Sequence, residues 1–122
     1  MPLSGCSQLI GKPYEYGTNG ETVDCIALVI QALDLMGINN PGVKADWYEM
    51  SAREIIGELD RYTERIAEPA YDGDIVVIAG SPPAFGVAWQ SGILFINRQS
   101  MRVDWKPASL LLIRRCFRTK KT

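Results

Sequence analysis

The feature that most constrains this chain of 122 residues is an apolar segment between positions 24 and 37. Apolar side chains from Ile26 to Met36 cover most of the circumference of a helix. Asp24 belongs to the residue types that cap helix N-termini, and Gly37 belongs to the type that ends helices. A helix that is apolar on so many sides must be covered on most of them. The sequence therefore predicts a helix over about 25–36 at the centre of the core.

Two further helical segments are expected in the first half of the chain. Residues 3–10 can form a short helix that stops at Gly11, and a glycine-rich shaped loop follows over residues 11–23. Ser51 and Glu54 have the spacing of a capping box, which predicts a helix from about 46 or 52 to 59. The first half is therefore expected to be helical apart from its loops.

The second half has the pattern of short strands separated by glycine- and proline-containing turns. The expected strands cover residues 75–78, 84–90, 93–98, 101–105 and 112–118, with 61–67 as a further candidate. Helices first and strands afterwards are typical of an α+β domain. The sequence therefore predicts N-terminal helices packed on an antiparallel sheet of about five strands.

Length and composition indicate one globular domain over residues 1–122. Hydrophobic residues make up 47% of the chain and charged residues 22%, which excludes a disordered or low-complexity chain. No apolar run approaches the roughly 20 residues of a membrane-spanning helix, so no membrane partner is expected.

Charge is unevenly distributed along the chain. The net charge is −1, yet five of the 13 basic residues and no acidic residue lie within the last nine positions. The remainder is therefore acidic, and we expect no nucleic acid partner. The basic C-terminal end, residues 114–122, is expected to be a solvated end, with a docking strip for an acidic partner as the alternative. Its basic residues are Arg114, Arg115, Arg118, Lys120 and Lys121.

The chain contains no histidine, which removes the commonest general base and metal ligand of proteins. Its three cysteines, Cys6, Cys25 and Cys116, are an odd number and lie far apart along the chain. This spacing argues against a disulfide framework and against a zinc site. We therefore expect no metal and no cofactor.

Cys25 is the cysteine whose position has chemical consequences. It follows the glycine-rich loop and the capping residue Asp24, so it becomes the first residue of the predicted helix. Unpaired N–H groups and the positive end of the helix dipole favour a thiolate there. A cysteine on an apolar helix can equally be a small buried apolar side chain. The local features leave both interpretations open.

Motifs related to this arrangement extend over nearly the whole chain. They are Gly11-Lys12-Pro13-Tyr14 with Gly17, Val23-Asp24-Cys25 with Leu28-Val29, Gly73-Asp74-Ile75-Val76, and Gly86-Val87 followed by residues 91–97. Together these segments resemble the NlpC-type peptidases, which are papain-like cysteine hydrolases that cut the peptides of bacterial cell walls. The resemblance implies a papain-like fold, Cys25 as the position of the nucleophile, and Tyr14 close to it.

The resemblance also indicates which parts of the chemistry are missing. The family's catalytic histidine falls on Ala84, or on Phe85 with a shift of one residue, and neither side chain can take a proton. The family's third polar residue falls on Asn97 with an offset of one residue, and otherwise on Ile96. The serine and glycine that follow the family's cysteine are isoleucine and alanine here. We therefore expect a domain that has lost its peptidase chemistry, with residual thiol chemistry as the alternative.

Three functions are compatible with these observations. The closing segment, residues 112–118, is similar to the last strand of phage-tail members of the family. This favours a structural or assembly component of a phage-like tail, at its tip, hub or baseplate, with other tail or baseplate proteins as partners. Such a protein would be made in the host cytoplasm and located in the virion, and a cytoplasmic protein is the alternative. The other functions are an active hydrolase that cuts peptidoglycan stem peptides with Cys25, and a soluble module that binds a peptide or a cell-wall fragment.

Aromatic residues supply candidate contacts for a partner, because aromatic side chains dominate interface hot spots. Tyr16 and Trp89, together with Asp24, are the candidate binding residues near the predicted groove. The further candidate anchors are Trp47, Tyr48 and Trp105. Packing in the core is the competing interpretation of the tryptophans and Tyr48, and we favour it.

Overall fold

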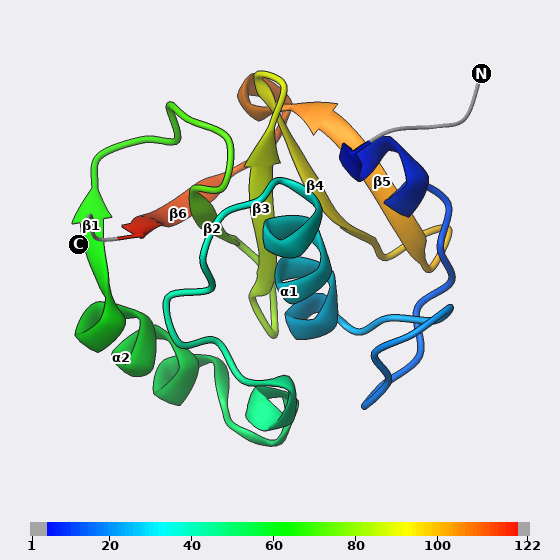
Figure 1. Cartoon of the computed structure of the whole chain (residues 1–122), viewed down its shortest axis with the longest axis horizontal. Coiled ribbons are helices and arrows are strands. Elements are labelled where there is room, and N and C mark those ends of the chain that lie inside the picture. Colours follow the sequence, from blue (N-terminus) through cyan, green and yellow to red (C-terminus); the bar gives the residue numbers. More distant parts are fainter. Residues whose placement is uncertain (1–4, 120–122) are drawn as a thin grey trace.

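The computed structural model describes residues 5–119. Its long apolar helix, α1 (Cys25–Leu35), confirms the helix predicted there. Asp24 caps α1 with a carboxylate oxygen that accepts a hydrogen bond from the N–H of Ala27 at 2.7 Å. After the helix, Gly37 adopts a φ of 70°, which glycine tolerates without strain. In Figure 1, α1 lies over the middle of the sheet, as its apolar surface requires.

The second helix, α2 (Ala52–Tyr62), begins after Ser51. Its capping box is confirmed, because Ser51 and Glu54 exchange side-chain and backbone hydrogen bonds. Three short 3-10 helices are η1 (Gly5–Leu9), η2 (Ala45–Glu49) and η3 (Ala108–Leu110). The short helix expected over residues 3–10 corresponds to η1, and residues 3 and 4 lie outside the described part of the chain. No helix within residues 5–119 is both long enough and apolar enough to cross a bilayer.

The sheet is antiparallel throughout, with six strands in the order β1-β6-β2-β3-β4-β5. The strands are β1 (Thr63–Ile66), β2 (Ile75–Ile78), β3 (Ala84–Trp89), β4 (Gly92–Asn97), β5 (Arg102–Pro107) and β6 (Ile113–Thr119). The expected number of about five is wrong by one. The additional strand is β1, an edge strand that pairs only with β6. Two of its four side chains are exposed, so it has little of the apolar pattern by which strands are predicted.

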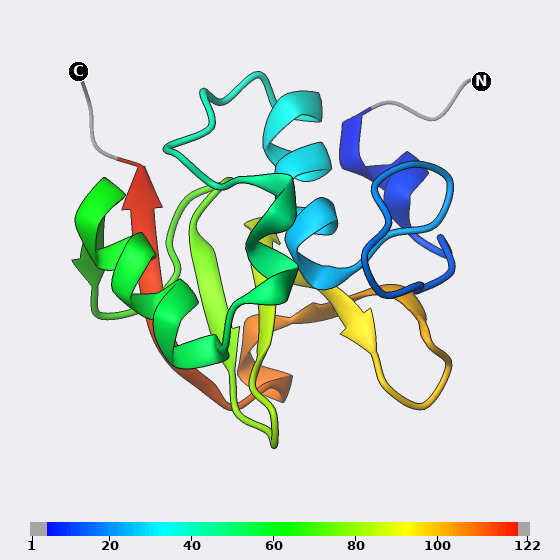
Figure 2. The same ribbon diagram turned by 90° about the horizontal axis from the view of Figure 1, so that it is seen from below.

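Both faces of the sheet carry apolar clusters. Figure 2 shows α1 and α2 on the same side of the sheet, and the main core lies on this side. Val77 and Phe117 belong to that main core, whereas their strand neighbours Val76 and Cys116 belong to a smaller cluster on the opposite face. This alternation is the period of two residues expected of strands. It explains why every residue of β2 is buried.

A buried ion pair ties the last strand to the turn before β2. The side chain of Asp74 is 2% exposed, and both of its carboxylate oxygens accept hydrogen bonds from Arg118 at 3.0 Å. The N–H groups of Ala70 and Tyr71 donate to the same carboxylate. Burial raises the pKa of Asp74, but Arg118 and these N–H groups lower it by more, so the pKa lies below its usual value. The Gly73-Asp74 motif therefore has a structural role in this fold.

The basic end is a strand as far as the structure describes it. Residues 114–119 belong to β6, and Lys120 and Lys121 lie outside the described residues. Arg114 and Arg115 are exposed, as expected of a solvated end. Arg118 differs from this expectation, because the buried carboxylate of Asp74 holds it.

Candidate functional site

The loop before α1 positions Cys25 against the sheet. The N–H of Tyr14 donates to the carbonyl oxygen of Met101 at 2.9 Å, which fixes the loop to the turn between β4 and β5. On the other side, the ammonium group of Lys12 donates to the side-chain oxygen of Gln31 on α1 at 2.8 Å. The loop is thus held from both sides, and the first turn of α1 is brought next to β3 and β4.

A pocket of about 360 Å³ opens beside Cys25. Its walls come from the loop before α1, the start of β3, the end of β4 and the two turns that flank these strands. Residues that line it include Cys25, Tyr14, Ala84, Ile96, Arg98 and Met101. We call it the cysteine pocket. It brings together Cys25, Tyr14 and Ala84 from the predicted site residues.

The environment of the half-buried Cys25 thiol favours its protonated form. Burial is the largest influence and raises the pKa of Cys25, and the carboxylate of Asp24 raises it further. The backbone N–H groups of Phe85, Cys25 and Ile26 act in the opposite direction, yet the pKa stays above its usual value. Desolvation therefore outweighs the stabilisation of a thiolate that the helix N-terminus predicts.

The carboxylate of Asp24 is hydrogen-bonded to the backbone of α1, and Asp24 does not line the cysteine pocket. It is buried, and its carboxylate accepts the hydrogen bond of the Ala27 N–H. Burial raises the pKa of Asp24, while the N–H groups of Ala27, Ile26 and Gly17 lower it in part. Its position is that of the predicted helix cap, and the structure gives it no contact with the interior of the pocket.

Tyr14 and Arg98 are the other polar side chains of the cysteine pocket. Burial raises the pKa of Tyr14, and the charges of Cys25 and Asp24 raise it further. The phenol is therefore protonated near neutral pH and can donate a hydrogen bond. The guanidinium of Arg98 donates a hydrogen bond to the carbonyl oxygen of Pro82. Among the described residues that line the pocket, none is a base that could accept the proton of the thiol at neutral pH.

The strand β3 distinguishes the two candidate positions for the missing histidine. Ala84 begins the strand and lines the cysteine pocket. Phe85 is 3% exposed and packs in the main core, so only its backbone N–H is directed to the thiol. Ala84 is therefore the position from which a longer side chain could reach Cys25.

Asn97, the candidate third polar residue, lies outside the cysteine pocket. Its side-chain oxygen accepts a hydrogen bond from the N–H of Gln99 at 2.9 Å, and its amide nitrogen donates to Asp104 at 3.0 Å. These bonds close the turn after β4. The preceding residue, Ile96, lines the pocket instead. Ile96, which matches the family's third polar residue without an offset, therefore lies in the pocket with Cys25, and it is apolar.

The candidate aromatic contacts are dispersed. Tyr16 is 64% exposed and stacks edge-to-face on Tyr48, with 5.0 Å between the ring centroids. Trp89 ends β3, the strand that Ala84 begins, and its carbonyl oxygen accepts a hydrogen bond from Trp105. Neither Tyr16 nor Trp89 lines the cysteine pocket. Trp47 is buried in the main core, as the packing interpretation expects.

Sequence reasoning missed Arg98, Met101 and the two prolines of the cysteine pocket. They come from the turns after β2 and β4, and nothing in their own sequence indicates that these turns meet at Cys25. Within the described residues, no cluster of three or more Cys, Asp or Glu side chains could hold a metal ion. No family model matches the sequence, and no match is found among curated proteins.

Proposed function

We propose that this chain is a catalytically inactive NlpC-type domain with a papain-like fold, and that it serves as a structural or assembly component of a phage-like tail. One observation carries the first part of the proposal. The cysteine pocket presents Ala84 and Ile96 at the two positions where the resemblance places a histidine and a polar residue. A thiol at the first turn of a helix packed on an antiparallel sheet is also the arrangement that the resemblance implies.

The chemistry of the cysteine pocket supports an inactive domain. Amide hydrolysis by a thiol needs a thiolate and a group that protonates the leaving amine. Burial and the carboxylate of Asp24 raise the pKa of the Cys25 thiol, which disfavours the thiolate, and no imidazole lines the pocket to take and return a proton. General acid–base catalysis contributes about 10²–10⁴-fold to such reactions. A domain that lacks it can retain its fold and its pocket while losing a useful rate.

The similarity of the closing strand to phage-tail members of the family supports the role in a tail. β6 (Ile113–Thr119) contains most of the segment that carries this similarity, and it is paired on both sides within the sheet. The cysteine pocket has mainly apolar walls and would be available as a docking surface once it no longer holds substrate. We place the protein at the tip, hub or baseplate, where it would contact other tail proteins.

Two assays test the two parts of this proposal separately. The purified chain is incubated with peptidoglycan, and released peptides are measured against the Cys25→Ala variant. We expect the two proteins to release the same background amount. A release that depends on Cys25 would show an active hydrolase.

The assembly role is tested on particles from cells that produce the phage-like tail together with a tagged version of this chain. We expect the tag in purified particles, in a fixed ratio to the other tail proteins, and at one end of the tail in immunogold images. A tagged chain that stays monomeric and is absent from the particles would contradict the role.

A further inference from the structure

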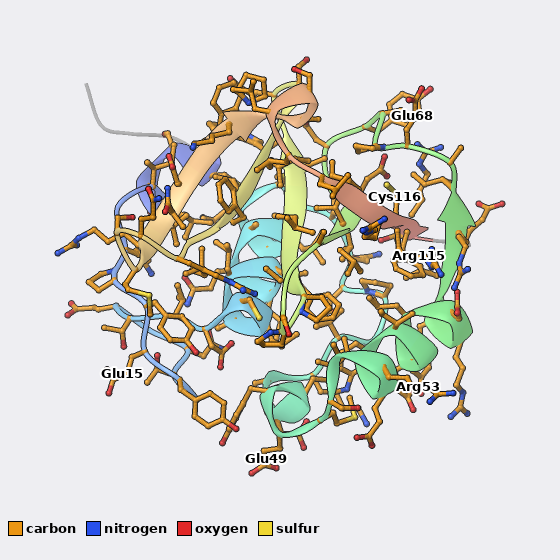
Figure 3. The ribbon with its side chains drawn as sticks, turned by 180° about the vertical axis from the view of Figure 1, so that it is seen from behind. Glu15, Glu49, Arg53, Glu68, Arg115 and Cys116 are labelled. Carbon is orange, nitrogen blue, oxygen red and sulfur yellow. The ribbon has the colours of Figure 1, made fainter. Side chains whose placement is uncertain are left out.

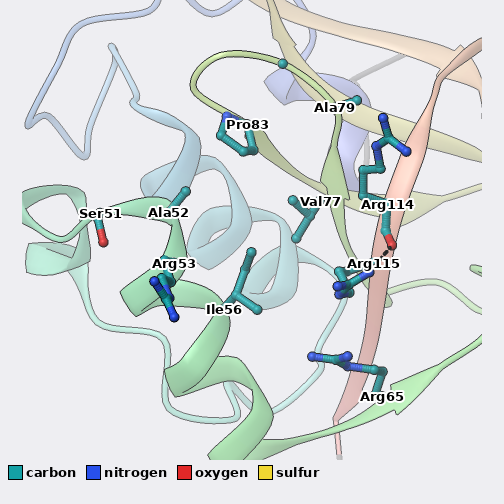
Figure 4. Close-up of a pocket in the computed structure, with 11 residues that line it drawn as sticks. Ser51, Ala52, Arg53, Ile56, Arg65, Val77, Ala79, Pro83, Arg114 and Arg115 are labelled. Atoms are coloured by element: carbon teal, nitrogen blue, oxygen red, sulfur yellow. Dashed lines mark hydrogen bonds between the residues drawn. The ribbon is translucent and has the colours of Figure 1, made fainter.

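A larger pocket, of about 890 Å³, lies between the start of α2 and the strands β2 and β6 (Figure 4). Four arginines from three elements line it: Arg53 from α2, Arg65 from β1, and Arg114 and Arg115 from β6. None of the described residues that line it is acidic. Its volume lies within the range of about 300–1,000 Å³ that is usual for ligand sites. We call it the arginine pocket.

The register of the sheet places two of these arginines on the face that carries α2. Arg115 is paired with Val77, and Arg65 is paired with Phe117 on the neighbouring strand. Directly paired residues share a face of a sheet, and Val77 and Phe117 both belong to the main core beneath the helices. Arg65 and Arg115 are therefore diagonal neighbours on that face, and Arg65 stacks over the ring of Phe117 at 5.7 Å.

An irregularity in β6 explains why Arg114 lines the same pocket as its neighbour Arg115. Val77 pairs with Arg115, but the next residue, Ile78, pairs with Ile113, so Arg114 is skipped in the register. Consecutive residues of a regular strand face opposite sides, whereas a β-bulge redirects the extra residue. Arg114 and Arg115 consequently both line the arginine pocket. The guanidinium of Arg115 is oriented by a hydrogen bond to the carbonyl oxygen of Arg114 at 3.1 Å.

Most of the positive charge in this pocket is not neutralised within the described chain. Arg65 pairs with Asp60, and the two side chains are 48% and 43% exposed, so solvent screens this pair. Arg53, Arg114 and Arg115 form no ion pair with a carboxylate among residues 5–119. Figure 3 shows Arg53, Arg115 and Glu68 on one side of the molecule and Glu15 on the other, and Glu68 does not line the arginine pocket. Guanidinium groups gathered without acidic partners favour an anionic ligand.

Apolar side chains complete the arginine pocket and restrict the kind of anion. Ile56, Val77, Ala79 and Pro83 line it together with the arginines. In Figure 4, Arg53 lies on the α2 side of Ile56 and Val77, and Arg65, Arg114 and Arg115 lie on the strand side. The charges thus surround an apolar centre. A single inorganic anion would occupy a small part of such a pocket and leave this apolar surface unused.

We propose that the arginine pocket binds an acidic segment of a partner protein, in which carboxylates alternate with apolar side chains. Carboxylates match the fork of donors on arginine and can form paired hydrogen bonds with it. The apolar side chains of the segment would cover Ile56 and Val77. This proposal rests on the arginine pocket alone, and it stands whether or not the chain belongs to a tail.

The proposal is tested by fluorescence anisotropy with a labelled six-residue peptide of alternating glutamate and leucine. The control peptide has glutamine in place of glutamate. The protein variants are Arg53→Gln and Arg115→Gln, and Arg61→Gln is the matched control. Arg61 lies on the same helix as Arg53, is exposed, and does not line the pocket. Circular dichroism confirms that each variant is folded.

We expect the glutamate peptide to bind and the glutamine peptide not to bind. Loss of one charge-assisted hydrogen bond should weaken binding about tenfold in Arg53→Gln and in Arg115→Gln, and Arg61→Gln should bind like the parent protein. Absence of binding, or equal weakening by all three variants, would overturn the proposal. Displacement of the peptide by an equal concentration of inorganic phosphate or of a single-stranded oligonucleotide would also overturn it, because the site would then recognise phosphate.

Discussion

The two pockets share Pro83 as a wall residue but differ in how they are built. The cysteine pocket lies within the motifs that resemble a family of hydrolases, yet its decisive positions, Ala84 and Ile96, are apolar. The arginine pocket takes Arg114 and Arg115 from the closing segment and adds Arg53 and Arg65, so that it concentrates four positive charges. The fold around the cysteine pocket can therefore persist after its chemistry is lost, whereas the arginine pocket forms only when α2 and β1 pack beside the closing strand. For this chain, the arginine pocket is the proposed site for an acidic segment of a partner, and the cysteine pocket is expected to be without peptidase chemistry.

The largest expected effect is a loss of stability when the ion pair of Arg118 is broken, compared with the loss of an arginine from the arginine pocket. Asp74→Ala removes the buried partner of Arg118 and should lower the free energy of unfolding by about 2–4 kcal/mol. Arg115→Ala, in the same strand as Arg118, should change it by less than about 0.5 kcal/mol, because Arg115 is exposed. Urea denaturation measures both. Equal losses in the two variants would mean that the arginine pocket is also part of the structural framework.

The same ion pair predicts a pH dependence of stability. The pKa of Asp74 is lower in the folded protein than its unfolded value of about 3.9. The unfolded state therefore binds the proton more readily, and the contribution of Asp74 is complete above about pH 4 and is lost as the pH falls through the folded pKa. The stability difference between the parent protein and Asp74→Asn should accordingly shrink in acid. A difference that stays constant from neutral pH into acid would contradict this account.

A histidine at position 84 should partly restore the missing chemistry of the cysteine pocket. A neighbouring imidazolium favours the thiolate, so Ala84→His should lower the pKa of Cys25 by about one unit or more. The pH dependence of alkylation by iodoacetamide gives this pKa. Ala84→Asn is the control, because its side chain is polar but does not become cationic. An unchanged pKa in Ala84→His would mean that position 84 does not face the thiol as the structure places it.

The smallest expected effect concerns the turn after β4. Asn97→Ala removes hydrogen bonds at 2.9 and 3.0 Å and a longer one at 3.4 Å from the N–H of Ser100, and should cost about 0.5–1.5 kcal/mol of stability. It should leave the pKa of Cys25 unchanged, since Asn97 does not line the cysteine pocket. Thermal melting and alkylation measure the two quantities. A clear shift of the thiol pKa would restore Asn97 as the third polar residue of the site.

Much of the fold could be predicted from local sequence signals. The apolar segment between Asp24 and Gly37 predicts α1, the capping box predicts the start of α2, and the turns delimit strands of the second half. The sequence predicts the edge strand β1 only weakly, because two of its four side chains are exposed and the apolar pattern of a strand is missing. Caps, turns and apolar segments can be recognised in the sequence because they depend on residues that are close together along the chain.

The sites were less predictable, because they depend on contacts between distant segments. Cys25, Tyr14 and Ala84 could be grouped through the resemblance, but the choice between Ile96 and Asn97 required the register of β4. The sequence indicates the basic end as a candidate docking strip, but only the packing of α2 and β1 brings Arg53 and Arg65 beside it. In a regular strand the side chains of Arg114 and Arg115 would face opposite sides of the sheet. They line the same pocket because β6 is irregular at this point, and no sequence signal predicts that irregularity.

The measurement that tests the central claim most directly is the rate of Cys25 alkylation as a function of pH. Cys6 and Cys116 are replaced by serine, so that only one thiol remains; both are buried, and burial together with the charge of Asp72 raises the pKa of Cys6 to about 11. We predict a midpoint at or above about 8.5, the value of an ordinary thiol, because the cysteine pocket offers no base. A midpoint well below about 8 would show that the thiol is still activated, and it would contradict the assignment of an inactive domain.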